Sequence, residues 1–271
     1  MTQKEKAIRF RALHEGHTFV IPNPWDVISA RLLAGLGFEA LATSSAASAA
    51  AFGRTDGHIT REQALDHARA IVEAVDVPVS ADLENGFGDR PEDVAETVRL
   101  AAEAGVCGCT IEDSTGNSAH PLYDFQLAVE RIAAGAEAAK ALSFPFMLTA
   151  RAHNFLYAGA TLDETIRRLQ AYEKAGAEVL FAPGLPDVES VRTVCSAISK
   201  PFNFMVGIPG KSFSVAELSK AGVKRISLAT SMYRAAMTGL LDAASEIKEK
   251  GTFEFVDRIK STAELNKLMK I

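Results

Sequence analysis

The 271-residue chain has few cysteines, no uninterrupted apolar run long enough to cross a membrane, and no excess of basic charge. Three cysteines, Cys107, Cys109 and Cys195, are too few for a disulfide scaffold. Their spacing is C-x-C plus one distant residue, which does not match the paired C-x-x-C pattern of a structural zinc site. The most apolar stretch, residues 32–52, is interrupted by Glu39 and predicts no membrane-spanning helix.

The balance of charge excludes further classes of partner. The 29 Lys and Arg residues are outnumbered by 34 Asp and Glu residues, which gives a formal net charge of −5. Basic residues occur at most in pairs, so no clustered basic face for a nucleic-acid backbone is visible. The N-terminal segment lacks the apolar stretch of a secretory signal. We therefore expect a cytoplasmic protein that binds neither nucleic acid nor membranes.

Short apolar runs rich in strand-forming residues recur along the chain, and each is followed by a stretch in which apolar residues have helical spacing. Because the runs are almost continuously apolar, they predict strands buried on both faces of a parallel sheet. Glycines that close the intervening helices, such as Gly105 and Gly176, precede several of these runs. The predicted strands are Thr18–Ile21, Ala40–Thr43, Val79–Leu83, Gly108–Glu112, Phe146–Arg151, Val179–Ala182, Phe202–Val206 and Arg225–Leu228.

Strand–helix units of this number and size predict an α/β fold, a (β/α)8 TIM barrel that forms a single domain over residues 1–271. An open doubly wound sheet is the alternative, but no G-x-G-x-x-G motif follows the first strand. Residues 252–271 form a separate apolar tail that we expect to be helical. Two hypotheses stay open for this tail: packing on its own barrel, or exchange between the subunits of an oligomer.

Acidic residues follow three neighbouring predicted strands, at the barrel end where chemistry is expected. Asp56 lies beyond the second strand, Asp82 and Glu84 end the third, and Glu112 ends the fourth. Converging carboxylates repel one another and need a cation, and an all-oxygen set favours Mg²⁺ or Mn²⁺. Because one residue separates Asp82 from Glu84, we expect both side chains on one side of the strand. A helix cap or a salt bridge is the alternative for each acid, and for Asp89 we prefer a helix start.

Other polar residues are predicted on the same rim. Arg151, at the end of the fifth strand, offers a planar fork of donors for a substrate carboxylate or phosphonate, or balances the acids. Ser44, Ser45 and Ala46 begin a turn or helix whose backbone N–H groups could approach an anion, although tight packing also explains small residues. His153 is a candidate acid/base or a hydrogen-bonding rim residue.

With these residues placed, the chain resembles the isocitrate lyase/phosphoenolpyruvate mutase superfamily. Four motifs occur in the family's order and extend the resemblance over nearly the whole chain. They are T-S-S-A-A-S-A-A-A-F-G-R-T-D-G at 43–57, S-A-D-L-E-N-G-F-G at 80–88, I-E-D-S at 111–114 and T-A-R-A-H-N-F at 149–155.

The resemblance implies Mg²⁺ (or Mn²⁺) beside a small 2-oxo acid, and a pyruvate enolate formed when a bond to carbon breaks. It also implies homodimers or homotetramers that exchange the last helix. Asp82 would be the direct metal ligand, and Glu84, Glu112 and Asp56 would hold the metal through waters; Glu84 stands where many members have Asp. The implied catalytic residues are Arg151, Glu112 and Asp56, and the implied substrate-binding residues are Ser44, Ser45, Ala46, Trp25, His153 and Asn203.

The loop at residues 112–123 departs from the pattern of the lyases for isocitrate and methylisocitrate, because it has neither their cysteine nor a lysine. This departure argues against those two substrates, and we expect Cys107 and Cys109 to be packing residues. The main hypothesis is a Mg²⁺-dependent carbon–carbon lyase of a small 2-oxo acid, such as an oxaloacetate decarboxylase. The Asn117-Ser118 pair echoes the phosphonopyruvate-processing members, so P–C chemistry is one alternative. A non-catalytic barrel that binds a 2-oxo acid is the other.

Overall fold

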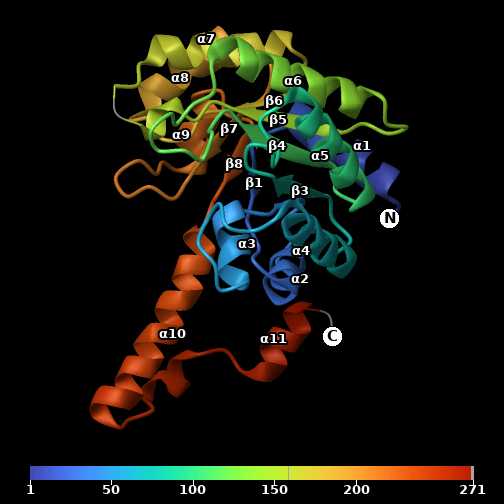
Figure 1. Ribbon diagram of the computed structural model, residues 1–271. Coiled ribbons are helices and arrows are strands. Elements are labelled where there is room, and N and C mark those ends of the chain that lie inside the picture. Colours follow the sequence, from blue (N-terminus) through green and yellow to red (C-terminus); the bar gives the residue numbers. More distant parts are fainter. Residues whose placement is uncertain (158, 270–271) are drawn as a thin grey trace.

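The computed structural model describes residues 1–157 and 159–269, which form a barrel of parallel strands surrounded by helices (Figure 1). The strands pair in the order β1-β8-β7-β6-β5-β4-β3-β2. The N–H of Ala42 donates to the carbonyl of Pro22 at 3.0 Å and joins the two ends of this order. The strands are β1 (Phe19–Ile21), β2 (Leu41–Ala42), β3 (Val79–Asp82), β4 (Gly108–Glu112), β5 (Met147–Arg151), β6 (Val179–Phe181), β7 (Phe202–Met205) and β8 (Arg225–Ser227).

The predicted (β/α)8 barrel is therefore confirmed, and the open doubly wound alternative is wrong. Every observed strand lies inside a predicted one, because burial on both faces makes these segments apolar throughout. On β4, Cys109 and Ile111 belong to the core beneath the helices, whereas Thr110 faces the barrel interior. This alternation leaves one side of each strand free to carry polar groups inside the barrel.

Helices connect the strands and cover the outside of the barrel (Figure 1). Many of them begin at a residue whose side chain accepts a hydrogen bond from a backbone N–H of the first turn, for example Thr60 before α4 and Asp187 before α8. The predicted helix start near Asp89 is present, but Arg90 is the N-cap of α5, and the Asp89 carboxylate accepts from the Tyr123 hydroxyl at 2.6 Å. The helices are α1 (Gln3–Glu15), α2 (Val27–Gly35), α3 (Ser45–Ala51), α4 (Arg61–Ala74), α5 (Pro91–Glu103), α6 (Phe125–Lys140), α7 (Leu162–Lys174), α8 (Val188–Ala197), α9 (Val215–Lys220), α10 (Ser231–Lys250) and α11 (Thr262–Met269), with short 3-10 turns at Asn154–Leu156 and Glu254–Arg258.

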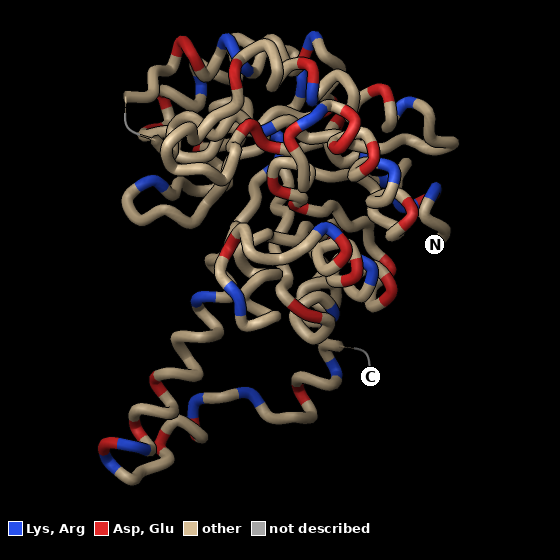
Figure 2. The backbone as a smooth tube through the Cα atoms, in the orientation of Figure 1, with Lys and Arg blue, Asp and Glu red and all other residues tan. Residues whose placement is uncertain are grey.

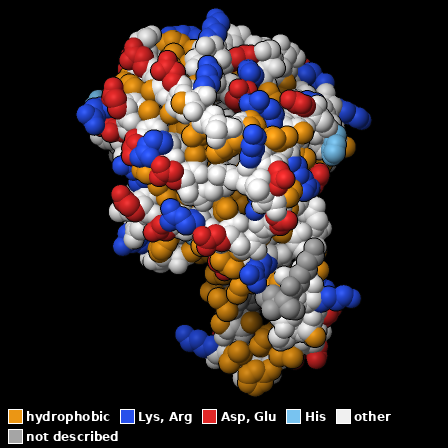
Figure 3. Space-filling model, turned by 90° about the vertical axis from the view of Figure 1, so that its right-hand side faces the viewer, with side chains coloured by type: hydrophobic (Ala, Val, Ile, Leu, Met, Phe, Trp, Pro, Cys, Tyr) orange, Lys and Arg blue, Asp and Glu red, His pale blue; other side chains and the backbone are white. Residues whose placement is uncertain are grey.

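The tail helices α10 and α11 differ from the others in their packing. Helix α10 leaves the barrel as a projecting arm, and none of its residues is buried within the described chain (Figure 1). Apolar side chains gather along this arm and the segment that follows it (Figure 3), and Leu240 of α10 and Phe253 beyond its end are each 62% exposed. Helix α11 returns to pack on α2, where a Cβ added to Gly35 would lie 1.8 Å from the carbonyl oxygen of Leu268. The end of the tail thus contacts its own barrel, and α10 contacts the barrel near its start, where Met232 packs against the core and Tyr233 against Trp25.

The surface carries both signs of charge. Lys and Arg positions are interspersed with Asp and Glu positions along the backbone of the barrel (Figure 2). Among the described residues, no helix combines the length and the apolar character needed to span a bilayer.

Candidate active site

Two adjoining cavities open at the end of the barrel where the strands finish. The inner cavity, of about 190 Å³, lies within the mouth of the barrel and is lined by residues that include Ser44, Ser45, Ala46, Asp56, Asp82, Arg151, Asn203 and Arg225. The outer cavity, of about 680 Å³, is lined by residues that include Asp56, Glu84, Glu112, Asn117, Arg151 and His153. The fold therefore brings all four predicted carboxylates and the predicted arginine to one rim.

Glu84 lies at the rim, but it follows strand β3 instead of ending it as expected. Strand β3 ends at Asp82, and Glu84 has a left-handed backbone with φ of 51°, so strand alternation does not set its direction. Alternation along a strand therefore does not apply to Glu84, although Asp82 and Glu84 both line the cavities at the rim. Burial, together with the charges of Asp82, Asp56 and Glu112, raises the pKa of Glu84 to about 8. Its buried Oε1 atom has no hydrogen-bond partner among the described residues.

Arg151 lies between the carboxylates. Its Nη1 atom is 3.0 Å from Oε2 of Glu112 and 4.0 Å from Oδ2 of Asp82. Burial acts to raise the pKa of Glu112, but Arg151 and His153 hold that pKa below its usual value. Burial raises the pKa of Asp82, and Arg151 only partly offsets this effect. In this structure Arg151 thus balances the acids, which leaves its predicted contact with substrate as a prediction.

The start of α3 orients Asp82. The backbone N–H of Ser45 donates to Oδ2 of Asp82 at 3.2 Å, and the N–H of Asp82 donates to the hydroxyl of Thr43 at 3.0 Å. Ser44 is the N-cap of this helix, as the sequence suggests, but its side chain makes no capping hydrogen bond. Ser44, Ser45 and Ala46 line the inner cavity, and none of them fills it with a bulky side chain.

The donor set fits a hard divalent cation that keeps much of its water. Carboxylate oxygens are the ligands Mg²⁺ prefers, and the partnerless Oε1 of Glu84 is an acceptor that such a cation or its water would satisfy. Among the described residues no three His, Cys, Asp or Glu side chains converge closely enough to coordinate one ion directly. Asp82 can bind the ion directly, and the other acids can bind it through waters.

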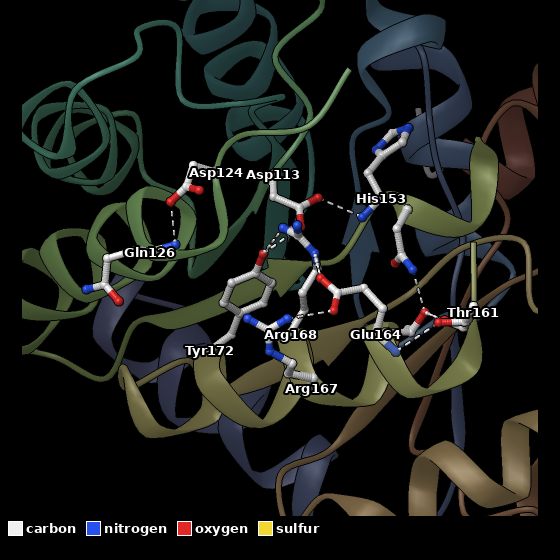
Figure 4. Close-up of polar contacts among 11 residues, drawn as sticks. Asp113, Asp124, Gln126, His153, Thr161, Glu164, Arg167, Arg168 and Tyr172 are labelled. Carbon is white, nitrogen blue, oxygen red and sulfur yellow. Dashed lines mark hydrogen bonds and ion pairs between the residues drawn. The ribbon is translucent and has the colours of Figure 1, made fainter. Parts of the chain in front are cut away.

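A buried network behind the rim holds the backbone of His153 (Figure 4). Oδ1 of Asp113 accepts from the N–H of His153 at 2.7 Å. Oδ2 of Asp113 accepts from the hydroxyl of Tyr172 at 2.5 Å and from Nη1 of Arg168 at 3.0 Å. The imidazole Nδ1 of His153 then lies 3.2 Å from Oε2 of Glu112. Sequence reasoning missed Asp113, although it follows Glu112 directly in the I-E-D-S motif.

Of two further residues predicted to bind substrate, Asn203 lines a cavity and Trp25 does not. Asn203 lines the inner cavity, where its amide donates to Ser227 at 3.0 Å and accepts from Arg225 at 2.8 Å. Trp25 is not among the described residues that line either cavity, and its ring packs edge-on against Tyr233 at 5.8 Å. Arg225 was not a sequence candidate, and the available signal was a charged residue at the start of an apolar strand.

Comparisons with known proteins connect this site to a family. The family model for phosphoenolpyruvate phosphomutase matches residues 10–248. A structure from Burkholderia cenocepacia J2315, provisionally described as a lyase/mutase, is 49% identical, with a TM-score of 0.96 over 99% of this chain and 97% of that one. A 2-methylisocitrate lyase from Halalkalibacterium halodurans is 29% identical over 93% of this chain and 85% of its own. An oxaloacetate decarboxylase from Paraburkholderia xenovorans is 30% identical over 83% of this chain and 76% of its own. Relatives named as carbon–carbon lyases agree with the predicted class of enzyme.

Proposed function

The chain belongs to the phosphoenolpyruvate phosphomutase family, and we propose that it is a Mg²⁺-dependent carbon–carbon lyase of a small 2-oxo acid, with oxaloacetate decarboxylation as the favoured reaction. The observation that carries this proposal is the group of four carboxylates on the rim, one of which has a buried oxygen without a hydrogen-bond partner in the described part of the chain. A decarboxylase named among the relatives supports the choice of reaction.

Each group of the site has a task in this proposal. Bound Mg²⁺ supplies Lewis acidity for the negative charge that develops on the 2-oxo acid as its bond to carbon breaks. Asp82 holds the ion directly, and Glu84, Glu112 and Asp56 hold its waters. The backbone at Ser44, Ser45 and Ala46 receives the carboxylate of the substrate.

The cationic and polar groups orient the other end of the substrate. Arg151 moves from its contact with Glu112 to a second carboxylate, for which its planar fork is suited. His153 and Asn203 position the substrate from the two cavities that they line. Because Trp25 is not among the described residues that line either cavity, its part in substrate binding is indirect.

The chain is proposed to work as a single-domain barrel in a homodimer or homotetramer. The exposed apolar side chains of α10 and of residues 252–259 support this proposal, since an apolar arm of this kind is stabilised when another copy covers it. The contact of α11 with α2 keeps the far end of the tail on its own barrel. Sedimentation equilibrium of the full chain measures the oligomeric state, and a monomer at micromolar concentration contradicts the proposal.

The test of the proposed reaction is release of pyruvate from a panel of 2-oxo and 2-hydroxy diacids, with Mg²⁺ and with EDTA. We expect turnover that EDTA abolishes and that Asp82→Ala loses together with metal binding. Asp66→Ala is the matched control, because this acid is exposed and pairs with Arg69 along its own helix. Turnover that persists in EDTA or in Asp82→Ala would falsify the proposal.

P–C bond chemistry is the second candidate, because Asn117 of the N-S pair lines the outer cavity. Phosphorus NMR of phosphonopyruvate with concentrated protein separates the two reactions, and an unchanged spectrum excludes this one. Tight Mg²⁺-dependent binding of oxalate without any turnover favours a non-catalytic binding barrel instead.

A further inference from the structure

A buried arginine spans the interior of the barrel beneath the rim. Arg225 begins β8 and is 4% exposed. Its Nε donates to Oδ1 of Asn203 on β7 at 2.8 Å, and its Nη2 donates to the hydroxyl of Thr149 on β5 at 3.0 Å. Its Nη1 lies 3.4 Å from Nε2 of His14 on α1. Because these partners come from three elements, the guanidinium is fixed inside the barrel.

None of these partners neutralises the charge. Asn203 and Thr149 are uncharged, and burial together with Arg225 itself lowers the pKa of His14 to about 3, so that this imidazole is neutral. Within residues 1–157 and 159–269 no carboxylate lies within 4.0 Å of Arg225. Burial lowers the pKa of Arg225 to about 9, which leaves it charged at neutral pH. The barrel interior therefore contains a cation without a contacting counter-ion.

The inner cavity is where this charge acts. Arg225 lines it together with Asp82, Arg151 and the backbone of Ser45. For an assumed separation of about 10 Å and an effective dielectric constant near 20, a unit charge changes the binding of a singly charged ligand by roughly tenfold and that of a doubly charged ligand by roughly a hundredfold. The sign of the effect depends on the ligand: the cation repels a divalent metal and attracts a carboxylate.

We propose that Arg225 is a positioning residue that sets the charge balance of the inner cavity. Its positive charge strengthens the binding of the anionic substrate and weakens the binding of the divalent cation beside Asp82. The role for the metal rests on the proposed function, whereas the role for the anion does not. Four carboxylates line the site, and the positive charge of Arg225 keeps the site selective for anionic ligands despite them. A merely structural role for Arg225 has a different signature, because loss of structure weakens both ligands.

The test measures two affinities in opposite directions. Calorimetric titrations use Mg²⁺ alone, and oxalate alone in the presence of EDTA, with the full chain. In Arg225→Met we expect Mg²⁺ to bind about a hundredfold more tightly and oxalate about a hundredfold more weakly, because each carries two charges. Arg225→Lys keeps the charge but not the fork, and we expect both affinities to stay within about threefold of the original protein.

Parallel weakening of both ligands in Arg225→Met, or no change in either, overturns the proposal. Circular dichroism verifies folding, and Arg225→Gln, which keeps a hydrogen-bonding group, replaces the Met variant if that variant is unfolded. If the original protein binds no Mg²⁺, the proposed function fails, and the metal-free oxalate titration alone decides the role of Arg225. If the original protein binds neither ligand, both proposals are wrong.

Discussion

The hydroxyl of Tyr172 is predicted to contribute to stability through Asp113. Tyr172 is fully buried, and its hydroxyl donates to the buried Asp113 carboxylate at 2.5 Å. Burial and this carboxylate raise the pKa of Tyr172 well above its usual value, so the hydroxyl remains a donor at neutral pH. A hydrogen bond to a charged group contributes about 1.5–3 kcal/mol, and Arg168 still contacts Asp113 after the change. We therefore expect Tyr172→Phe to lower the free energy of unfolding by about 2 kcal/mol.

Thermal and urea unfolding followed by circular dichroism measure this difference. For a chain of this length, a loss of that size lowers Tm by roughly 4 °C. Tyr157→Phe is the matched control, because its hydroxyl makes a longer contact of 3.2 Å with the neutral Ser114 hydroxyl. We expect the control to change stability by less than about 1 kcal/mol. Equal effects of the two substitutions, or no effect of Tyr172→Phe, would refute the assignment of a stabilising role to the buried Asp113 network.

Three further predictions concern the tail, the barrel interior and the rim. Gly35→Ala places a Cβ against Leu268, so limited proteolysis should release α11 faster, whereas Gly239→Ala in α10 meets no atom and should not have this effect. Because the pKa of His14 is depressed, the stabilising effect of the neutral imidazole is complete above pH 6.5 and is lost as pH falls toward 3. Urea unfolding should show that the difference in free energy of unfolding between the original protein and His14→Gln shrinks by about 1.4 kcal/mol per pH unit below 6.5. Because the pKa of Glu84 is raised, the stability of the metal-free protein falls as pH rises from about 4.5 through 8. Glu84→Gln should therefore stabilise the metal-free protein at pH 8 by about 1–2 kcal/mol, after allowance for the partial exposure of this side chain. The same substitution should weaken the binding of Mg²⁺ in a calorimetric titration. An unchanged cleavage rate, a pH-independent gap or a destabilised Glu84→Gln would contradict the respective argument.

The amino-acid sequence by itself predicted the barrel and the location of its acids. Strands buried on both faces are apolar throughout, so segments such as Gly108–Glu112 are recognisable without any knowledge of their neighbours. Parallel strands also end at one rim, so acids that follow separate strands, such as Asp82 and Glu112, were expected to meet. Both inferences depend on local pattern and on a chain direction that all strands share.

Only the tertiary structure decided which groups pair inside the barrel and where the tail lies. Arg225 donates to Thr149 inside the barrel, and Asp113, which follows β4, accepts from Tyr172 of α7, although these partners are 76 and 59 residues apart in the chain. Periodicity reports which face of an element is buried, but it does not report what that face contacts. The left-handed turn at Glu84 and the projection of α10 likewise depend on packing over the whole fold. The sequence thus determined which residues gather at the rim, and long-range packing decided how their charges are balanced.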